Sequence, residues 1–281
     1  MNRNVKYYLI RIFIILLLIE TCYLIYANNR NIVPVSVSDE IKVLANQKTI
    51  LNLLINDTDE DNDSLFIDSF EGPYSGILEK NKEGIQYTPN DEFVGIDSFR
   101  YKISDGKTLS NSSLVNLNVI KEVNMLFEAE KFKKEIDYKP FIIEYDENAS
   151  GGSYVTTPTE IKSSWNDIPD EGCLTFMIDL ESETKLDIWV KVKNERAGFW
   201  VIIDDKDPVE CYFYSTPLVW EWKNIGLIFD LTKGKHQLKI KRRRSGTNLD
   251  MIFVTNIEQS AKEIEDVVES LKSNEDSKVK L

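Results

Sequence analysis

The sequence contains a single histidine, His236, among 281 residues. A serine or cysteine triad needs a histidine base held by a third group, and His236 lies in an alternating, strand-like segment that is a poor setting for one. Zinc sites built from several histidines are excluded for the same reason. Two carboxylates could still serve a glycosidase, but the two β-sandwiches expected for the rest of the chain leave no large catalytic scaffold. We therefore predict that the protein is not an enzyme.

Positive charge is also scarce. The chain carries 34 Lys and Arg against 47 Asp and Glu, which gives a net charge of −13. Binding of nucleic acid depends on clustered basic side chains, and the one such cluster lies at residues 239–244. We expect no nucleic acid partner.

Cysteine is rare as well, with three in the chain. If Cys22 is lost with an N-terminal leader, Cys173 and Cys211 remain. In an exported protein these two could form one disulfide. Both lie in apolar, strand-like runs that equally suit two buried free thiols, so the sequence leaves both alternatives open.

The chain lacks a long uncharged apolar run. Residues 12–19 are apolar, but Arg11 and Glu20 bound them, so the run is well below the roughly 20 residues that a bilayer-spanning helix needs. The basic start before it is typical of a secretory signal. We predict that residues 1–27 are a signal peptide cleaved after Ala27, with an uncleaved membrane anchor through residues 7–27 as the alternative. In both cases bacterial-type export leaves the rest of the chain secreted or at the cell surface.

Helical periodicity is absent from residues 34–121. Short runs rich in valine, isoleucine, tyrosine and phenylalanine alternate with turn residues, and Asp105-Gly106 is a strong tight-turn signal between two runs. This pattern predicts an antiparallel β-sandwich of about immunoglobulin size.

An acidic loop interrupts this region. Aspartates at 57, 59, 61 and 63 alternate as at the start of a helix-loop-helix calcium site. The match fails because Asn62 stands where that loop needs glycine, Asp68 stands where it needs glutamate, and the flanking segments are strand-like. We therefore reject a helix-loop-helix site.

The region as a whole resembles the cadherin-like tandem repeats of bacterial surface proteins. Three motifs carry the resemblance: Leu54-Ile-Asn-Asp-Thr-Asp-Glu-Asp-Asn-Asp-Ser-Leu65, Tyr87-Thr-Pro89 and Gly95-Ile-Asp-Ser-Phe-Arg-Tyr-Lys-Ile-Ser-Asp-Gly106. The resemblance implies a spacer or adhesion domain, with a second calcium ion at Asp57, Asp59 and Asp61. The alternative is a solvated acidic loop with weak ion affinity.

A second domain is expected at residues 124–257, after a short joint. Strand-like runs without helical periodicity lie at 173–180, 186–193, 199–204, 211–214, 225–230, 236–241 and 249–254. Long strands without helices suit a β-jelly roll. The predicted fold class is therefore all-β, with an immunoglobulin- or cadherin-like sandwich followed by a jelly roll.

Three carboxylates stand out in the second domain. Asp250 lies in an otherwise apolar strand, where an unpaired charge is costly. Glu128 and Glu130 lie on an expected strand and point to one face of it. If the first and last strands are neighbours, the three carboxylates converge and suit calcium, which takes about 6 to 8 oxygen ligands. The alternative is that the glutamates face solvent and Asp250 pairs with an arginine at 242–244.

All five tryptophans lie in this domain, at 165, 189, 200, 220 and 222. Sugar rings offer apolar faces with a rim of hydroxyls, so a sugar site combines a flat aromatic face with a few polar partners. Trp189 and Trp200 lie within expected strands and are predicted core residues. Trp165 lies in a polar loop, and Trp220 and Trp222 share one face of a strand or turn, which makes these three the candidates.

In order and spacing, five motifs over about residues 124–257 resemble the carbohydrate-binding modules of families six and thirty-five. They are Phe127-Glu-Ala-Glu130, Ala149-Ser-Gly-Gly-Ser-Tyr154, Trp220-Glu-Trp222, Gly234-Lys-His-Gln-Leu238 and Gly246-Thr-Asn-Leu-Asp250. The resemblance implies a galactose-binding-like jelly roll with calcium at Glu128, Glu130 and Asp250. It also implies sugar contacts, for which the candidates are Asn248, one of Trp220 and Trp222, Tyr154, and Trp165 as the opposing aromatic.

Residues 258–281 change character. Apolar residues recur at spacings of four, three, four and three, at Ile257, Ala261, Ile264, Val268 and Leu271. This predicts a short helix with one apolar seam, followed by a charged, disordered end. At about two heptads the helix is too short to dimerise firmly alone. It could dock on the jelly roll, oligomerise weakly or fray.

These features predict an exported, non-catalytic protein that binds a polysaccharide or glycoconjugate through a calcium-stabilised jelly roll on a β-sandwich spacer. The rival hypothesis is a structural or adhesion protein that binds protein partners and has no sugar site. An exposed Trp220 or Trp222 beside Asn248 favours the first hypothesis, and burial of these rings favours the second. The sequence predicts neither the sugar nor the oligomeric state.

Overall fold

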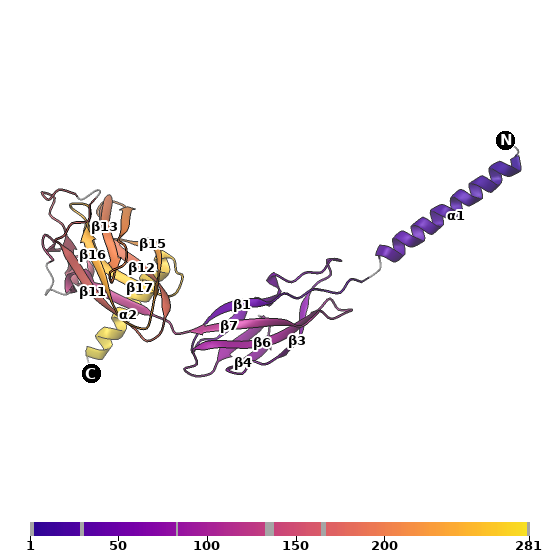
Figure 1. The fold of residues 1–281 in the computed structure, drawn as a ribbon, viewed down its shortest axis with the longest axis horizontal. Coiled ribbons are helices and arrows are strands. Elements are labelled where there is room, and N and C mark those ends of the chain that lie inside the picture. Colours follow the sequence, from indigo (N-terminus) through magenta and orange to yellow (C-terminus); the bar gives the residue numbers. More distant parts are fainter. Residues whose placement is uncertain (1–2, 29–30, 83, 133–137, 164–166, 280–281) are drawn as a thin grey trace. The chain divides into compact units, whose positions relative to one another are not determined.

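The computed structural model describes residues 3–28, 31–82, 84–132, 138–163 and 167–279. The chain divides into two compact units, Met1–Lys121 and Glu122–Leu281, and each is described by itself (Figure 1). The division falls in the short joint expected from the sequence.

The first unit begins with helix α1 (Arg3–Asn28), which spans most of the expected signal or anchor segment. Its apolar side chains at residues 12–19 are exposed. None of the described helices is long and apolar enough to cross a membrane.

The rest of the first unit is a sandwich of two sheets. One sheet has the strand order β1-β7-β6-β3 and the other β2-β5-β4. The strands are β1 (Asp39–Leu44), β2 (Thr49–Leu51), β3 (Phe66–Glu71), β4 (Gly76–Asn81), β5 (Gly84–Pro89), β6 (Gly95–Ser104) and β7 (Ser113–Ile120). The sequence predicted an antiparallel sandwich, but β1 joins the edge of its sheet parallel to β7, while the other named pairs are antiparallel.

A buried carboxylate ties the two sheets of this unit together. Asp97 on β6 is 3% exposed. It accepts hydrogen bonds from the backbone N–H groups of Tyr74 (3.1 Å), Ser75 (3.0 Å) and Ser98 (2.8 Å), and from the hydroxyl of Tyr87 (2.7 Å). Because Tyr87 belongs to β5, these bonds join the loop before β4, the second sheet and β6 at one side chain.

The second unit is a jelly-roll sandwich. A six-stranded sheet runs β15-β12-β17-β10-β9 with β8 paired to β17, and a four-stranded sheet runs β11-β16-β13-β14. The first strands are β8 (Asn124–Glu128), β9 (Ile142–Tyr145), β10 (Ser153–Thr156), β11 (Cys173–Leu180) and β12 (Thr184–Val192). The others are β13 (Arg196–Ile203), β14 (Val209–Tyr214), β15 (Glu221–Leu231), β16 (Gly234–Arg242) and β17 (Asn248–Thr255). All seven strands expected between residues 173 and 254 are present.

The core of the second unit lies between its sheets. Alternate residues of facing strands are buried in it, such as Ile188 and Val190 on β12 and Leu238 and Ile240 on β16. The first strand β8 pairs antiparallel with the last strand β17, from Met251 opposite Glu128 to Thr255 opposite Asn124. The expected pairing of the first and last strands of this domain is therefore present.

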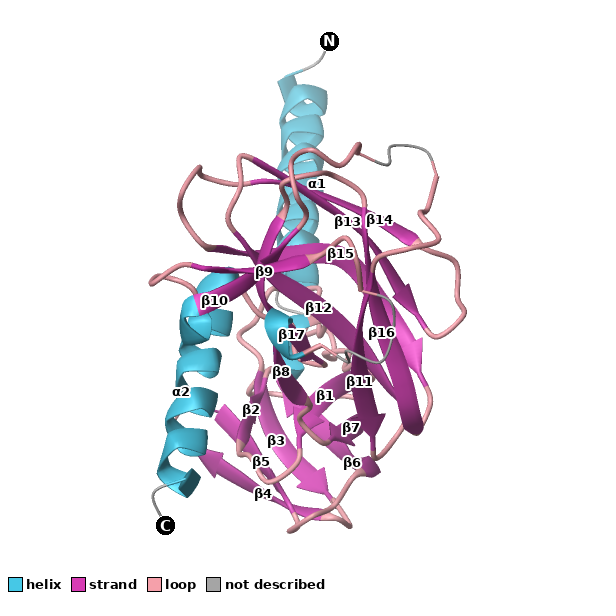
Figure 2. Ribbon diagram, turned by 90° about the vertical axis from the view of Figure 1, so that its left-hand side faces the viewer, coloured by secondary structure: helices cyan, strands magenta, loops and turns pink. Residues whose placement is uncertain are grey.

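Helix α2 (Ala261–Val279) docks on the six-stranded sheet (Figure 2). Ile264 and Val268 are buried against Trp222, Met251 and Phe253 on the face of the sheet that points away from the core. Of the three alternatives for the tail, docking on the jelly roll is the one observed. The apolar seam of the helix is used within its own chain.

The two cysteines of the second unit are not bonded to each other. Cys173 on β11 and Cys211 on β14 are both buried free thiols. Burial raises the pKa of Cys211 to about 12, so its thiol stays protonated and unreactive at neutral pH. This resolves the open alternative in favour of buried free thiols.

The single histidine closes a turn of the four-stranded sheet. His236 is 8% exposed, and its Nδ1 lies 2.8 Å from Asp204 Oδ2, while its Nε2 lies 2.8 Å from the Thr232 carbonyl. The hydrogen bond to Asp204 is the main cause that raises the pKa of His236. Burial acts to raise the pKa of Asp204, but hydrogen bonds from His236 and the Gln237 N–H outweigh it and lower that pKa. The pair therefore stabilises the charged imidazolium relative to the neutral ring.

Replacing His236 with glutamine is expected to lower the free energy of unfolding by about 1 kcal/mol at pH 5.5 and by less at pH 8. A raised histidine pKa contributes fully below the unfolded value of about 6.5, and the contribution is lost as pH rises through the folded pKa. The lowered Asp204 pKa contributes above about pH 4 and is lost as pH falls through the folded value. The Asp204 side chain is 39% exposed, so solvent screening keeps the effect small. Guanidinium denaturation at both pH values measures the difference, and an equal loss at both would contradict this account.

Candidate functional site

Two aromatic rings meet at one end of the jelly roll. Tyr154 on β10 and Trp220, just before β15, pack edge to face with ring centroids 5.3 Å apart and planes 66° apart. Both side chains are only partly buried. The pair offers solvent an aromatic surface of the kind that stacks on the apolar face of a sugar.

A charged pair lies beside these rings. Asp146 accepts a hydrogen bond from the indole Nε1 of Trp220 (3.1 Å) and pairs with the ammonium of Lys193, which lies 5.6 Å from the centroid of the Trp220 ring. The hydrogen bond from Lys193 is the main cause that lowers the pKa of Asp146 to about 2. Tyr154 donates its hydroxyl to Glu144 Oε2 (2.7 Å). The aromatic pair therefore has both hydrogen-bond donors and hydrogen-bond acceptors at its edge.

Asn248 holds the strands beneath this pair. At the start of β17, its Oδ1 accepts a hydrogen bond from Thr156 Oγ1 (2.7 Å), and its Nδ2 donates to the Lys193 carbonyl (3.3 Å). The side chain thus links β10, β17 and the residue that carries the ammonium group. A direct sugar contact from Asn248 stays a prediction.

The other two predicted aromatic ligands do not join this surface. Trp222 is 6% exposed and lies in the apolar cluster under α2, where the helix covers it. Trp220 and Trp222 were expected to lie on one face and to be equally available to a ligand. They differ in exposure, because α2 covers Trp222 while Trp220 is only partly buried. Trp165 lies outside the described residues.

The three carboxylates predicted to bind calcium gather around Ser150. Its N–H donates to Asp250 Oδ1 (2.9 Å), and its hydroxyl donates to Glu128 Oε1 (2.6 Å). Glu130 Oε1 lies 3.6 Å from the position that a Cβ on Gly151 would take. A serine in the motif at 149–154 therefore links the first and last strands of the unit.

One detail of the predicted site is wrong. Glu130 does not continue the strand of Glu128, because the chain turns into a 3₁₀ helix at Ala129–Lys131. The turn places Ala129, 0% exposed, in the core and brings Glu130 toward the loop at 150–152. The two glutamates approach each other by this turn rather than by the alternation of a strand.

The carboxylate site has unmet hydrogen-bonding capacity. Among the described residues, Glu128 Oε2, Glu130 Oε2 and Asp250 Oδ2 are buried without a hydrogen-bond partner. Asp250 is 0% exposed, and burial raises its pKa to about 7. Unpartnered buried carboxylate oxygens are the type of donor that calcium prefers, so the chemistry of these residues suits this ion. Their oxygens do not all lie within 4.8 Å of one another, unlike those of Asp59, Asp61 and Asp63. Of the arginines offered as alternative partners of Asp250, Arg242 pairs with Glu171 and Arg243 with Glu210 among the described residues.

A lysine from α2 also reaches this site. Lys272 Nζ lies 3.5 Å from Glu128 Oε1 and donates a hydrogen bond to Ser150 Oγ. The sequence offered no sign of this contact, because Lys272 belongs to a segment expected to dock, oligomerise or fray. Asp146 and Lys193 were missed for a similar reason, since only the fold brings them to Trp220.

The aspartate loop of the first unit differs from its prediction. Carboxylate oxygens of Asp59, Asp61 and Asp63 lie within 4.8 Å of one another, and Lys107 pairs with Asp63 at 2.7 Å. Asp57 is not in this set. It is 9% exposed and accepts hydrogen bonds from the Tyr101 hydroxyl (3.0 Å) and the Val37 N–H (2.8 Å). The predicted ligand set of Asp57, Asp59 and Asp61 is therefore shifted by one aspartate.

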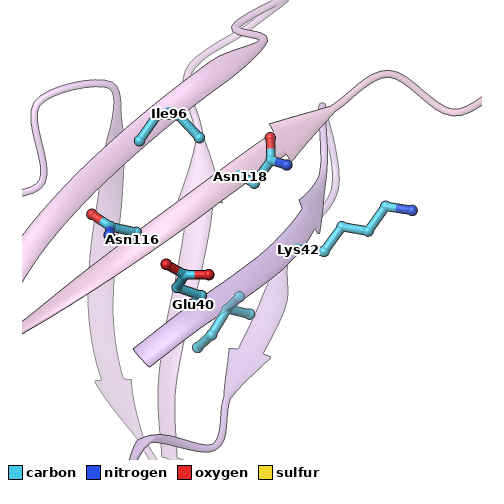
Figure 3. Close-up of a pocket in the computed structure, with 6 residues that line it drawn as sticks. Glu40, Lys42, Ile96, Asn116 and Asn118 are labelled. Atoms are coloured by element: carbon cyan, nitrogen blue, oxygen red, sulfur yellow. The ribbon is translucent and has the colours of Figure 1, made fainter. Parts of the chain in front are cut away.

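A shallow hollow of about 430 Å³ lies on the β1-β7-β6 surface of the first unit (Figure 3). Glu40, Ile96, Asn116 and Asn118 are among the residues that line it. No aromatic ring lines it, so it lacks the flat face that a sugar needs. The aromatic surface of the second unit is the better candidate site.

The first sandwich has the strand count, turns and buried tyrosines of an immunoglobulin-like fold. Residues 31–118 match the bacterial Ig domain family. The predicted Ig-like sandwich is therefore confirmed, and the match takes in the aspartate loop. No curated protein matches the chain.

Solved structures similar to this chain include carbohydrate-binding modules and enzymes. A family 35 carbohydrate-binding module from Clostridium thermocellum is 17% identical, with 46% of this chain and 97% of that chain covered and a TM-score of 0.37. A GH26-CBM35 β-(1,4)-mannanase from Podospora anserina is 16% identical, with 49% and 28% covered and a TM-score of 0.39. An exo-β-1,3-galactanase from Phanerochaete chrysosporium is 13% identical, with 60% and 37% covered and a TM-score of 0.37. The chain spans well under half of either enzyme.

Proposed function

We propose that the jelly roll of the second unit binds a polysaccharide or glycoconjugate, without catalysis, at the Tyr154–Trp220 surface. The observation that supports this most is the partly exposed aromatic pair with Asp146 and Lys193 at its edge. Bacterial-type export would place the site outside the cell, secreted or at the surface, with the bacterial Ig domain as its spacer.

The chemistry of the surface suits a sugar ring. A Trp220 face stacks on axial C–H groups, while carboxylate oxygens accept from hydroxyls and the Lys193 ammonium donates to them. Asp146 holds the indole and the ammonium in fixed positions, so little side-chain entropy is lost on binding. Fixed donors and acceptors beside a ring give the orientation that sugar recognition needs.

The charges of the surface favour a neutral sugar. Lys193 is already matched by Asp146, and Glu144 adds a further carboxylate beside Tyr154. A uronic acid would bring its own carboxylate to a surface where the Lys193 ammonium is already paired with Asp146. We therefore expect uncharged polysaccharides to bind more tightly than polyuronates.

Calcium at Glu128, Glu130 and Asp250 is proposed to stabilise this unit rather than to contact the sugar. The three side chains link β8, the 3₁₀ turn and β17 around Ser150. Calcium would supply the charge that the unpartnered oxygens lack. Tying the first strand to the last fixes the ends of the domain.

Replacing Trp220 with alanine is expected to lower affinity for a bound polysaccharide at least about fivefold, since about 1 to 3 kcal/mol of stacking and hydrogen bonding is lost. The test is binding of the full chain to a panel of neutral and acidic polysaccharides. Tyr74→Ala is the matched control, because Tyr74 is an aromatic side chain 92% exposed in the bacterial Ig domain. Equal binding by both variants, or no binding of any glycan by the unaltered chain, would refute the sugar site.

A further inference from the structure

Lys272 brings a positive charge from α2 to the carboxylate site. Its ammonium lies 3.5 Å from Glu128 Oε1 and donates to Ser150 Oγ. Its charge also acts on Glu130 and Asp250 and favours their ionised forms. Lys191 acts in the same direction on Asp250, and Lys131 on Glu130. Lys272 is the ammonium from outside the sandwich that reaches Glu128 Oε1 and Ser150.

The docked helix fixes the position of this ammonium. Ile264 and Val268 are buried against the sheet, and Glu265 pairs with Lys191 on β12 at 2.9 Å. Lys272 follows Val268 by four residues and so lies one turn further along the same face of the helix. Docking of the apolar seam therefore carries the ammonium to Ser150.

The nearby ammonium groups leave the carboxylate site incompletely compensated. Among the described residues, one oxygen of each carboxylate is buried without a hydrogen-bond partner, and Asp250 is 0% exposed. An ammonium group donates three hydrogen bonds at most. A divalent cation with oxygen ligands would satisfy more of these atoms than Lys272 does.

We propose that the Lys272 ammonium is an internal counter-ion of the carboxylate site in the absence of calcium. Calcium binding and docking of the end of α2 then compete. The proposal rests on the calcium site of the proposed function. Helix α2 would then do more than cover the sheet, because the docking of its last turns would depend on whether calcium is bound.

The competition follows from shared partners. Calcium held by the unpartnered Glu128 Oε2 would lie on the same carboxylate whose Oε1 meets Lys272 and accepts from Ser150. Two cations in one partly buried site repel each other with little screening. Calcium is therefore expected to displace the ammonium and loosen the last turns of α2, while Ile264 and Val268 keep the first turns docked.

The test compares calcium binding by the full chain and two variants with calorimetry. Lys272→Gln is expected to bind calcium about tenfold more tightly than the unaltered chain, because it removes the internal competitor. Lys262→Gln is the matched control, because Lys262 is exposed on the same helix and the variant has the same net charge. Its calcium affinity should equal that of the unaltered chain. Equal or weaker binding by Lys272→Gln overturns the competition.

A second measurement covers the case in which Lys272→Gln does not fold. In the unaltered chain, backbone amides at residues 266–273 should exchange hydrogen faster with calcium than with chelator. Unchanged or slower exchange overturns the proposal. Absence of calcium binding by all three proteins overturns both the competition and the calcium site, whereas loss of the sugar site alone would appear only in the Trp220→Ala experiment.

Discussion

Replacing Asp97 with alanine is expected to lower the free energy of unfolding of the bacterial Ig domain by about 3 to 4 kcal/mol. The carboxylate, 3% exposed, receives four hydrogen bonds. Its removal takes the acceptor from the part-buried N–H groups of Tyr74 and Ser75, and it leaves the Tyr87 hydroxyl only the longer bond to the Ser75 carbonyl at 3.4 Å. Each buried donor left without an acceptor costs about 1 to 3 kcal/mol. In a domain of this size the midpoint of thermal unfolding should fall by at least about 12 °C.

The two units make this measurement selective. All five tryptophans lie in the second unit, so tryptophan fluorescence follows that unit alone, while calorimetry follows both. The calorimetric transition of the Ig domain should move, and the fluorescence transition should stay in place. Asp68→Ala is the control, because it removes the same charge from an exposed position on β3 and should change stability by less than about 0.5 kcal/mol. A small effect of Asp97→Ala would show that Asp97 does not join the two sheets.

Replacing Trp222 with alanine is expected to cost the second unit about 3 kcal/mol and to release α2. The ring packs on Phe253, with centroids 6.4 Å apart, and on the buried seam of the helix. Among the described residues its indole N–H has no hydrogen-bond partner, so the cost should lie at the low end of the range for a buried tryptophan. Urea denaturation and hydrogen exchange at residues 261–273 measure the two effects.

Trp220→Ala is the matched comparison, because both tryptophans flank Glu221 and only one is covered by α2. Trp220→Ala should weaken polysaccharide binding and lower stability by about 1 kcal/mol or less. Trp222→Ala should lower stability strongly and leave binding intact below its unfolding transition. If both variants lost binding equally without a difference in stability, α2 would not cover Trp222 as described.

Much of the fold follows from local pattern. Alternation of apolar residues located the seven strands between residues 173 and 254, because a half-buried strand imposes a period of two on its sequence. Asp250 stood out for the opposite reason, as a charge in an apolar strand. It is 0% exposed and lies at the carboxylate site, so this departure from the pattern marked a real feature.

The rest depends on contacts that no local pattern records. The turn at Ala129–Lys131 replaces the expected strand alternation, since burial of Ala129 outweighs continuation of the strand. Asp146 and Lys193 are 47 residues apart and meet only when the strands are assembled. The apolar seam of the tail was visible, but which surface it covers is decided by Trp222 and Phe253 in a different part of the chain.

The parallel pairing of β1 with β7 has a mechanical consequence for the bacterial Ig domain. The first strand of the sandwich runs beside the last in the same direction, in register from Asp39 opposite Val115 to Leu44 opposite Ile120. The chain therefore enters the sandwich at one end and leaves it at the other. Tension between these ends pulls β1 and β7 along each other in opposite directions. The hydrogen bonds between the two strands are then loaded in shear, so they share the force and do not break one at a time. A domain threaded in this way bears load along its length.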